Sequence, residues 1–75
     1  MNEINWEYLA NLPDNSPKRY ETLKFLAQGY DCNDIAVLRC VSYNTARNSC
    51  VDLRIRVGAN SNAHLVSLAH QVEIL

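Results

Sequence analysis

The sequence predicts an all-α fold, a small bundle of helices. Two observations carry this prediction: apolar residues recur at spacings of three and four along most of the chain, and residues that cap helix N-termini precede several of these stretches. The chain has 75 residues, which suffice for one domain, because so short a chain buries only about 60% of the surface that its unfolded form exposes. An elaborate catalytic cleft is therefore not expected.

The first helical signals lie in the N-terminal third of the chain. A short N-terminal helix that ends before Pro13 is predicted, and residues 1–14 are interpreted as an accessory segment beside a domain over residues 15–75. Ser16 is a good N-cap and Pro17 suits the first helical position, so a helix is expected over residues 17–28, with Gly29 ending it. The apolar positions of the N-terminal helix are Ile4, Trp6, Tyr8, Leu9 and Leu12.

The middle of the chain predicts two helices that are close in sequence. Asp31, followed by Asp34, approximates a capping box for a helix over residues 32–40. Ser42 then caps a helix over residues 43–57, which Gly58 ends in a left-handed C-cap. Two helices joined by about three residues form a helix-turn-helix pattern.

The helix over residues 43–57 has two contrasting faces. One is a narrow apolar stripe for packing, formed by Ala46, Cys50, Leu53 and Val57. The opposite face holds Asn44, Arg47, Asn48, Val51 and Ile55. Aliphatic residues among amides and an arginine are unlike a merely solvated surface, so this face is expected to contact a partner.

A last amphipathic helix is expected after a polar link at residues 60–62. Its apolar positions are Leu65, Val66, Leu68, Ala69 and Val72. The seam is larger than the core of a four-helix domain needs, which predicts a homodimer through this helix. The dimer interface is expected at Leu65, Leu68, Ala69 and Val72.

Composition and charge limit the function. The chain is 48% hydrophobic and 20% charged, as in an ordinary globular protein. Its net charge of −1 argues against a nucleic-acid partner, but residues 1–34 carry three bases and six acids, whereas residues 35–75 carry four bases and two acids. The positive potential is therefore expected in the C-terminal half.

The sequence offers no targeting signal and no enzyme motif. It lacks an apolar membrane-spanning stretch and a signal peptide, so a cytoplasmic protein without a membrane partner is expected. The three cysteines, Cys32, Cys40 and Cys50, are spaced for neither a disulfide framework nor zinc and are interpreted as reduced, mostly packed thiols. His64 and His70 are six residues apart, which is unlike metal-ligand spacing. No catalytic residue, metal or cofactor is expected.

The order of caps, helices and glycines resembles a known family. Residues 16–29, SPKRYETLKFLAQG, resemble the opening of the LuxR-type (GerE-like) DNA-binding domain, T-P-R-E-x-E-V-L-x-L-L-A-x-G. The similarity continues at residues 34–36 (DIA against E-I-A), 41–47 (VSYNTAR against I-S-x-x-T-V-K) and 57–59 (VGA against L-G-V), and covers about residues 15–72. It implies a stand-alone four-helix domain whose third helix enters the major groove and whose fourth helix forms a dimer.

Four residues depart from the family pattern. Arg19 stands where the family has the glutamate of a capping box, and Arg39 stands where it has a core leucine. Because a buried unpaired arginine is implausible, Arg39 is expected to extend outward, towards a DNA phosphate. Ser49 replaces a common histidine and Asn62 a frequent arginine, and the second change removes one expected phosphate contact.

The resemblance implies a set of DNA contacts on the helix over residues 43–57. Arg47 corresponds to the family's groove-facing lysine and can pair with the O6 and N7 atoms of guanine, and Asn48 suits an adenine edge. Val51 suits a thymine methyl group, and Asn44 completes the base-contact set. The residues expected at the DNA backbone are Ser42, Thr45, Arg54, Arg56 and Arg39.

The sequence therefore predicts a sequence-specific, duplex-DNA-binding transcription regulator. The main alternative is a protein-binding module on the same scaffold that inhibits or modulates another regulatory protein. The acidic total charge and the aliphatic Val51 and Ile55 support this alternative, since both are tolerable at a protein interface. A weaker alternative is a thiol-based redox switch through Cys32, Cys40 or Cys50.

Overall fold

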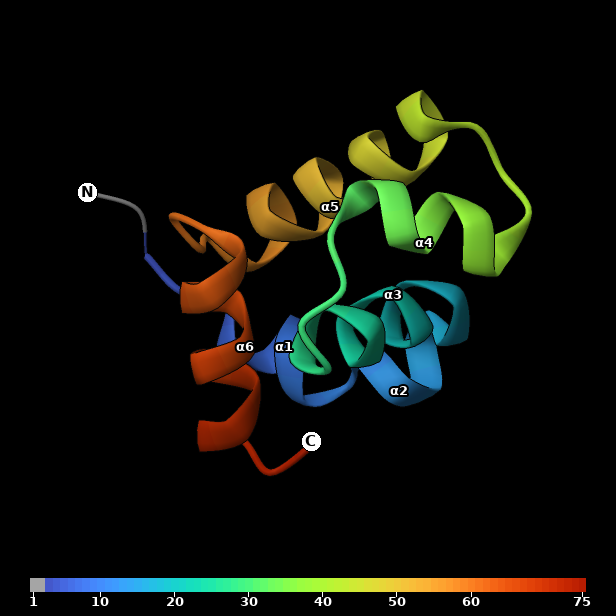
Figure 1. Cartoon of the computed structure of the whole chain (residues 1–75). Helices are drawn as coiled ribbons and strands as arrows, with labels where there is room; N and C mark the ends of the chain where they lie inside the picture. Colours follow the sequence, from blue (N-terminus) through green and yellow to red (C-terminus); the bar gives the residue numbers. More distant parts are fainter. Residues whose placement is uncertain (1–2) are drawn as a thin grey trace.

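The chain forms six helices in the computed structural model, which describes residues 3–75. No strand occurs in this range, which confirms the all-helical class. Figure 1 shows α4 and α5 on one side of the core, α1 to α3 on the other side and α6 across one end. The helices are α1 (Trp6–Ala10), α2 (Leu12–Asn15), α3 (Pro17–Ala27), α4 (Cys32–Arg39), α5 (Tyr43–Val57) and α6 (Asn62–Gln71).

The caps of α4 and α5 are those that the sequence predicts. The Asp31 side chain accepts a hydrogen bond from the Asp34 backbone N–H at 3.0 Å, and the Asp34 side chain accepts one from the Asp31 backbone N–H at 3.2 Å. Ser42 Oγ accepts from the Thr45 backbone N–H at 3.1 Å, and Gly58 ends α5 in the left-handed region with φ 89°. These local hydrogen bonds satisfy groups that the helices leave without partners at their ends.

The N-terminal segment differs from the expected accessory helix. It is broken into α1 and α2, and Pro13 lies in the first turn of α2, where its missing N–H removes no helical hydrogen bond. Leu9 and Leu12 are fully buried in the common core, and the Asn5 backbone N–H donates to the Val57 carbonyl at 2.9 Å. The segment is thus built into the same core as the rest, and nothing separates it at residue 14.

Most of the α6 residues expected at a dimer interface are buried in the core of the chain itself. Leu65 and Ala69 are fully buried and Leu68 nearly so, while Val72 is half-buried. The prediction of a surplus apolar seam is wrong because α6 packs against α3 and α5 of the same chain, which cover its apolar face. Leu65, Leu68 and Ala69 are therefore not available for a dimer interface, and the homodimer stays a prediction without these residues.

The two glycines offer a test of how the N-terminal segment packs. Both have φ near +90°, a conformation that costs other residues about 1–2 kcal/mol. A Cβ at Gly29 would meet open space, whereas a Cβ at Gly58 would collide with the Glu3 carbonyl oxygen. Gly29→Ala is therefore expected to lower the free energy of unfolding by about 1 kcal/mol, and Gly58→Ala by clearly more. Urea unfolding followed by circular dichroism measures both, and equal losses would contradict the described packing of residue 3 on α5.

Candidate nucleic-acid interface

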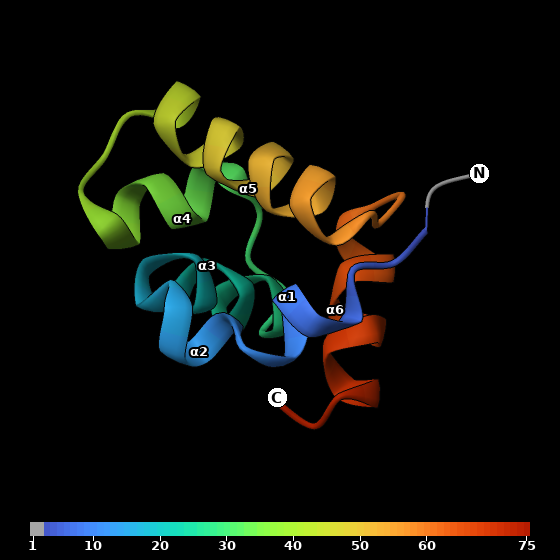
Figure 2. The same ribbon diagram turned by 180° about the vertical axis from the view of Figure 1, so that it is seen from behind.

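The candidate site is built on α5 and on its junction with α4. The two helices pack against each other and are joined by Cys40, Val41 and Ser42. The Val41 backbone N–H donates to the Ala36 carbonyl at 2.9 Å, which closes the turn over the end of α4. Figures 1 and 2 show α5 along one edge of the molecule, with its first turn at the end remote from α6.

Three of the four predicted base-contact residues lie together at the surface. Asn44, Arg47 and Asn48 are exposed, and among residues 3–75 no side chain makes a hydrogen bond or an ion pair with them. They lie at helical positions i, i+3 and i+4, so they share one face. We call these three residues the α5 polar face. Val51, one turn further on, is only half-buried beside this face, so it remains partly accessible.

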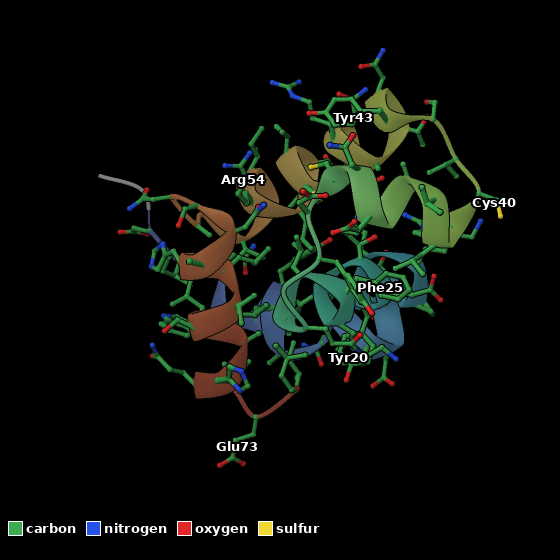
Figure 3. The ribbon with its side chains drawn as sticks, in the orientation of Figure 1. Tyr20, Phe25, Cys40, Tyr43, Arg54 and Glu73 are labelled. Atoms are coloured by element: carbon green, nitrogen blue, oxygen red, sulfur yellow. The ribbon has the colours of Figure 1, made fainter. Side chains whose placement is uncertain are left out.

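Tyr43 is an exposed neighbour of this face that the sequence analysis did not include. Its side chain is 47% exposed, and Figure 3 shows it at the outer edge of the molecule beside the first turn of α5. Its exposure could have been predicted from its position directly after the Ser42 N-cap, because a residue in the first turn of a helix, next to two exposed polar residues, has few core residues within reach. An aromatic ring here adds apolar area beside the α5 polar face.

The residues predicted at the DNA backbone do not form one group. Ser42 and Thr45 are exposed at the start of α5, where the Ser42 hydroxyl donates to Thr45 Oγ1 at 2.9 Å. Arg54 is half-buried, and its Nε atom is buried without a hydrogen-bond partner in the described part of the chain. Arg56 is exposed and paired with Asp52 at 2.9 Å. Thr45 and Arg54 are separated by about 14 Å along the helix, so only Ser42 and Thr45 adjoin the α5 polar face.

Arg39 does not extend outward, contrary to the prediction. Its side chain is 16% exposed, and its Nη1 atom donates to Thr22 Oγ1 at 3.0 Å, while Nε lies 3.8 Å from a carboxylate oxygen of Glu21. These contacts on α3 offset the cost of removing the guanidinium from water. As expected, Arg39 is not left buried and unpaired, but it is satisfied by partners on α3 and not by exposure to solvent.

A polar groove of about 490 Å³ lies between α3, α4 and α5, beside the α5 polar face. Its charged lining residues are Lys18, Arg19, Arg39 and Asp52. The Arg19 guanidinium contacts Asp52 through Nε at 3.0 Å and through Nη2 at 2.9 Å, and Nη1 donates to Ser16 Oγ at 3.2 Å. Lys18 and Arg19 were not among the predicted site residues, although Arg19 departs from the family pattern.

Asp52 neutralises part of the positive charge of α5 and α3. The hydrogen bond from Arg56, together with one from Arg19, lowers the pKa of Asp52, so this carboxylate stays ionised near neutral pH. Of the lysines and arginines, those with no ion pair to a carboxylate in residues 3–75 are Lys18, Lys24, Arg47 and Arg54. Arg47 is the one of these on the α5 polar face.

The three cysteines have different surroundings. Cys50 is buried and Cys32 is half-buried, as expected of thiols that are mostly packed, whereas Cys40 is exposed at the tip of the turn between α4 and α5 (Figure 3). Burial, together with the neighbouring Cys32, raises the pKa of the Cys50 thiol to about 11. All three are thiols in the structure, with no disulfide among them.

The raised pKa of Cys50 predicts a loss of stability in alkali. The unfolded state ionises this thiol near pH 9, its ordinary pKa, while the folded state keeps the proton up to about pH 11. The contribution of Cys50 to the free energy of unfolding is therefore expected to be constant below about pH 9 and to fall by about 2–3 kcal/mol as the pH rises to about 11. Urea unfolding of the wild type and of Cys50→Ala, each at about pH 9 and about pH 11, measures this loss of stability. Equal alkaline losses in the two proteins would assign the loss to other groups.

Residues 3–75 contain neither a membrane-spanning helix nor a cluster of metal ligands. No helix of the described chain combines the length and the apolar character that crossing a membrane requires. Within residues 3–75, histidine, cysteine and carboxylate side chains nowhere gather in threes at metal-binding distance. The His64 Nδ1 atom accepts a hydrogen bond from the Asn60 backbone N–H at 3.0 Å, which ties the link after α5 to the first turn of α6.

The site therefore combines an exposed polar helix face, two hydroxyl side chains at the start of the same helix and an adjoining groove with three cationic side chains. The likeness to LuxR-type domains remains one of sequence motifs. Comparisons of the chain with protein-family models, with curated proteins and with solved structures find no match in any of the three.

Proposed function

We propose that the chain is a sequence-specific, duplex-DNA-binding transcription regulator with no enzymatic activity, in which α4 and α5 act as a helix-turn-helix of the LuxR type. The observation that carries the proposal is the α5 polar face. Asn44, Arg47 and Asn48 are exposed and unengaged by other side chains of the described chain. They can contact base edges without breaking a side-chain interaction inside the protein, so binding has to desolvate and order these side chains but not to detach them from other residues.

The chemistry of this face suits base edges. An arginine forms two parallel hydrogen bonds with guanine O6 and N7, and an asparagine forms a pair with adenine N6 and N7. The major groove is about 12 Å wide and admits an α-helix with its side chains. In Figures 1 and 2 the first turns of α5 protrude from the end of the molecule remote from α6, so a groove can receive them without meeting α6.

Contacts to the DNA backbone are available next to the α5 polar face. The Ser42 and Thr45 hydroxyls are exposed at the N-terminus of α5, where the helix dipole also favours an anion. The acidic residues Glu7 and Asp14 lie on α1 and α2, away from the first turns of α5 in both views. These two acids therefore do not oppose the proposed contact, whereas Asp52 lies on α5 itself and is paired with Arg19 and Arg56. The net charge of −1 predicts weak binding to DNA of unrelated sequence.

Titration of a fluorescently labelled duplex of mixed sequence tests the proposal. Fluorescence anisotropy is expected to rise with protein concentration at low salt, and the logarithm of the binding constant is expected to fall linearly with the logarithm of the salt concentration. A labelled single strand of the same length is the control and is expected to bind more weakly. Absence of duplex binding at protein concentrations up to about 10⁻⁴ M would contradict DNA binding.

A second candidate function, a module that binds another regulatory protein, is favoured by one observation. Val37 and Ile55 are 76% and 73% exposed, and Leu38 and Tyr43 are also exposed, so α4 and α5 carry apolar area outside the core. Isolated exposed aliphatics are ordinary, but a protein partner would bury them. Under this function Val37→Ser abolishes inhibition of the partner regulator and the chain binds no duplex. Under the proposed function Val37→Ser leaves duplex affinity unchanged.

A further inference from the structure

The polar groove between α3, α4 and α5 has the side chains of an anion site. Its walls carry three cationic side chains, Lys18, Arg19 and Arg39, and one carboxylate, Asp52. We call it the cationic groove. Arg19 and Arg39 stand where the LuxR-type pattern has glutamate and leucine, whereas Lys18 stands where that pattern has arginine, so two of the three cationic side chains are particular to the present chain.

The two guanidinium groups in the groove are held in fixed orientations. Arg39 donates to Thr22 Oγ1, and Thr22 is itself 1% exposed and donates to the Lys18 carbonyl at 3.3 Å. Arg19 is held by Asp52 and by Ser16. Neither set of hydrogen bonds uses all the N–H donors of its guanidinium, so donors remain for a ligand. Because the arginines are already ordered, a ligand does not have to restrict their motion.

The ligand chemistry that fits is a phosphate group. Several cationic donors that converge from different helices suit an anion with several acceptor oxygens, and arginine pairs with phosphate through two parallel hydrogen bonds. Two carboxylates offset only part of the positive charge, because Asp52 is shared between Arg19 and Arg56 and Glu21 lies 3.8 Å from Arg39 Nε. Lys18 has no carboxylate partner in the described residues, which leaves its full charge for the ligand.

We propose that the cationic groove binds a backbone phosphate of the DNA strand that flanks α5, an inference that rests on the proposed function. Asn48 belongs both to the α5 polar face and to the lining of the groove, and Thr45 lines the groove too. A helix with its side chains is about 10–12 Å wide and nearly fills a major groove of about 12 Å. A strand beside α5 therefore brings its phosphates to the side where the cationic groove opens.

A matched pair of lysine variants tests this inference. Lys18 and Lys24 are both exposed on α3, but Lys18 lines the groove, whereas Lys24 lies over the Tyr20 ring at 4.8 Å. Lys18→Gln is expected to weaken duplex binding several-fold and to reduce the slope of log binding constant against log salt by about one unit. Lys24→Gln removes the same charge and is expected to leave the slope unchanged.

Arg39→Gln is the second variant. Like Lys18→Gln, it is expected to reduce the slope of log binding constant against log salt by about one unit. Its free energy of unfolding is measured alongside, since Thr22 loses its partner, and binding is compared at a temperature at which both proteins are folded. If the wild type binds duplex but Lys18→Gln, Arg39→Gln and Lys24→Gln all keep its slope, the phosphate site is wrong while DNA binding stands. If the wild type binds no duplex, the proposed function itself fails.

Inorganic phosphate distinguishes the two sources of such a group. Titrated into the isotope-labelled protein, it is expected to shift the backbone amide signals of Lys18 and Asn48 only weakly and to be displaced when duplex is added. Tight binding of inorganic phosphate that duplex does not displace would assign the groove to a free phosphate ligand and overturn its assignment to the DNA strand.

Discussion

Leu9→Ala is expected to lower the free energy of unfolding by about 2–5 kcal/mol. Leu9 is fully buried, although it lies in the segment that the sequence alone treats as an accessory. Removing three carbons from a buried leucine loses their transfer free energy and leaves a cavity that the neighbours refill only in part. For a domain of this size such a loss is a large share of the total stability.

The matched control for Leu9→Ala is Val37→Ala, which truncates an aliphatic residue that is 76% exposed. It is expected to change the free energy of unfolding by less than about 0.5 kcal/mol. Urea unfolding followed by far-UV circular dichroism measures both variants. If Leu9→Ala costs no more than Val37→Ala, the N-terminal segment does not pack in the core in solution.

Arg47→Ala is expected to weaken binding to a preferred duplex by about 1–3 kcal/mol, which is about 5- to 150-fold. Arg47 is the positively charged residue of the α5 polar face. It is exposed, and no ion pair holds it among residues 3–75. Loss of a bidentate contact with guanine also relaxes the preference at one base position. Anisotropy titrations with the preferred duplex and with single-base variants of it measure both effects.

Arg56→Ala is the matched control on the same helix. Arg56 is exposed but is paired with Asp52 and lies far along α5 from Arg47. Loss of the Arg56 side chain is expected to change the affinity for all duplexes by the same factor and to change no base preference. Arg47 lies off the buried stripe of α5, so Arg47→Ala is expected to keep the circular dichroism spectrum of the wild type. If both variants lower affinity equally for every duplex, Arg47 does not read a base.

The helices that could be predicted from sequence are those that local residues define. Helix ends depend on residues within one turn, so they can be recognised in the sequence. Examples are the reciprocal capping of Asp31 and Asp34, the Ser42 cap and the left-handed Gly58. The role of Leu9, Leu12 and the apolar face of α6 depends on which elements cover them. Periodicity shows that a face is apolar, but not whether the same chain or a second one buries it.

Of the candidate site, too, only the part that local spacing defines could be predicted from the sequence. The exposure of Asn44, Arg47 and Asn48 follows from their helical spacing opposite the buried stripe. The cationic groove does not, because it forms where Lys18, Arg39 and Asp52 meet from three different helices, and the packing of these helices decides which side chains meet. The partner of Arg39 was missed for the same reason, since Thr22 lies on another helix.

Selection of bound sequences from a pool of random duplexes tests most directly the claim that α5 reads DNA. The account predicts enrichment of a short motif in which a guanine is preferred at one position, with that preference lost when the selection is repeated with Arg47→Ala. An enriched motif that is palindromic would in addition indicate two half-sites bound by two copies of the chain. Recovery of sequences no different from the starting pool, by protein shown to be folded, would contradict the account.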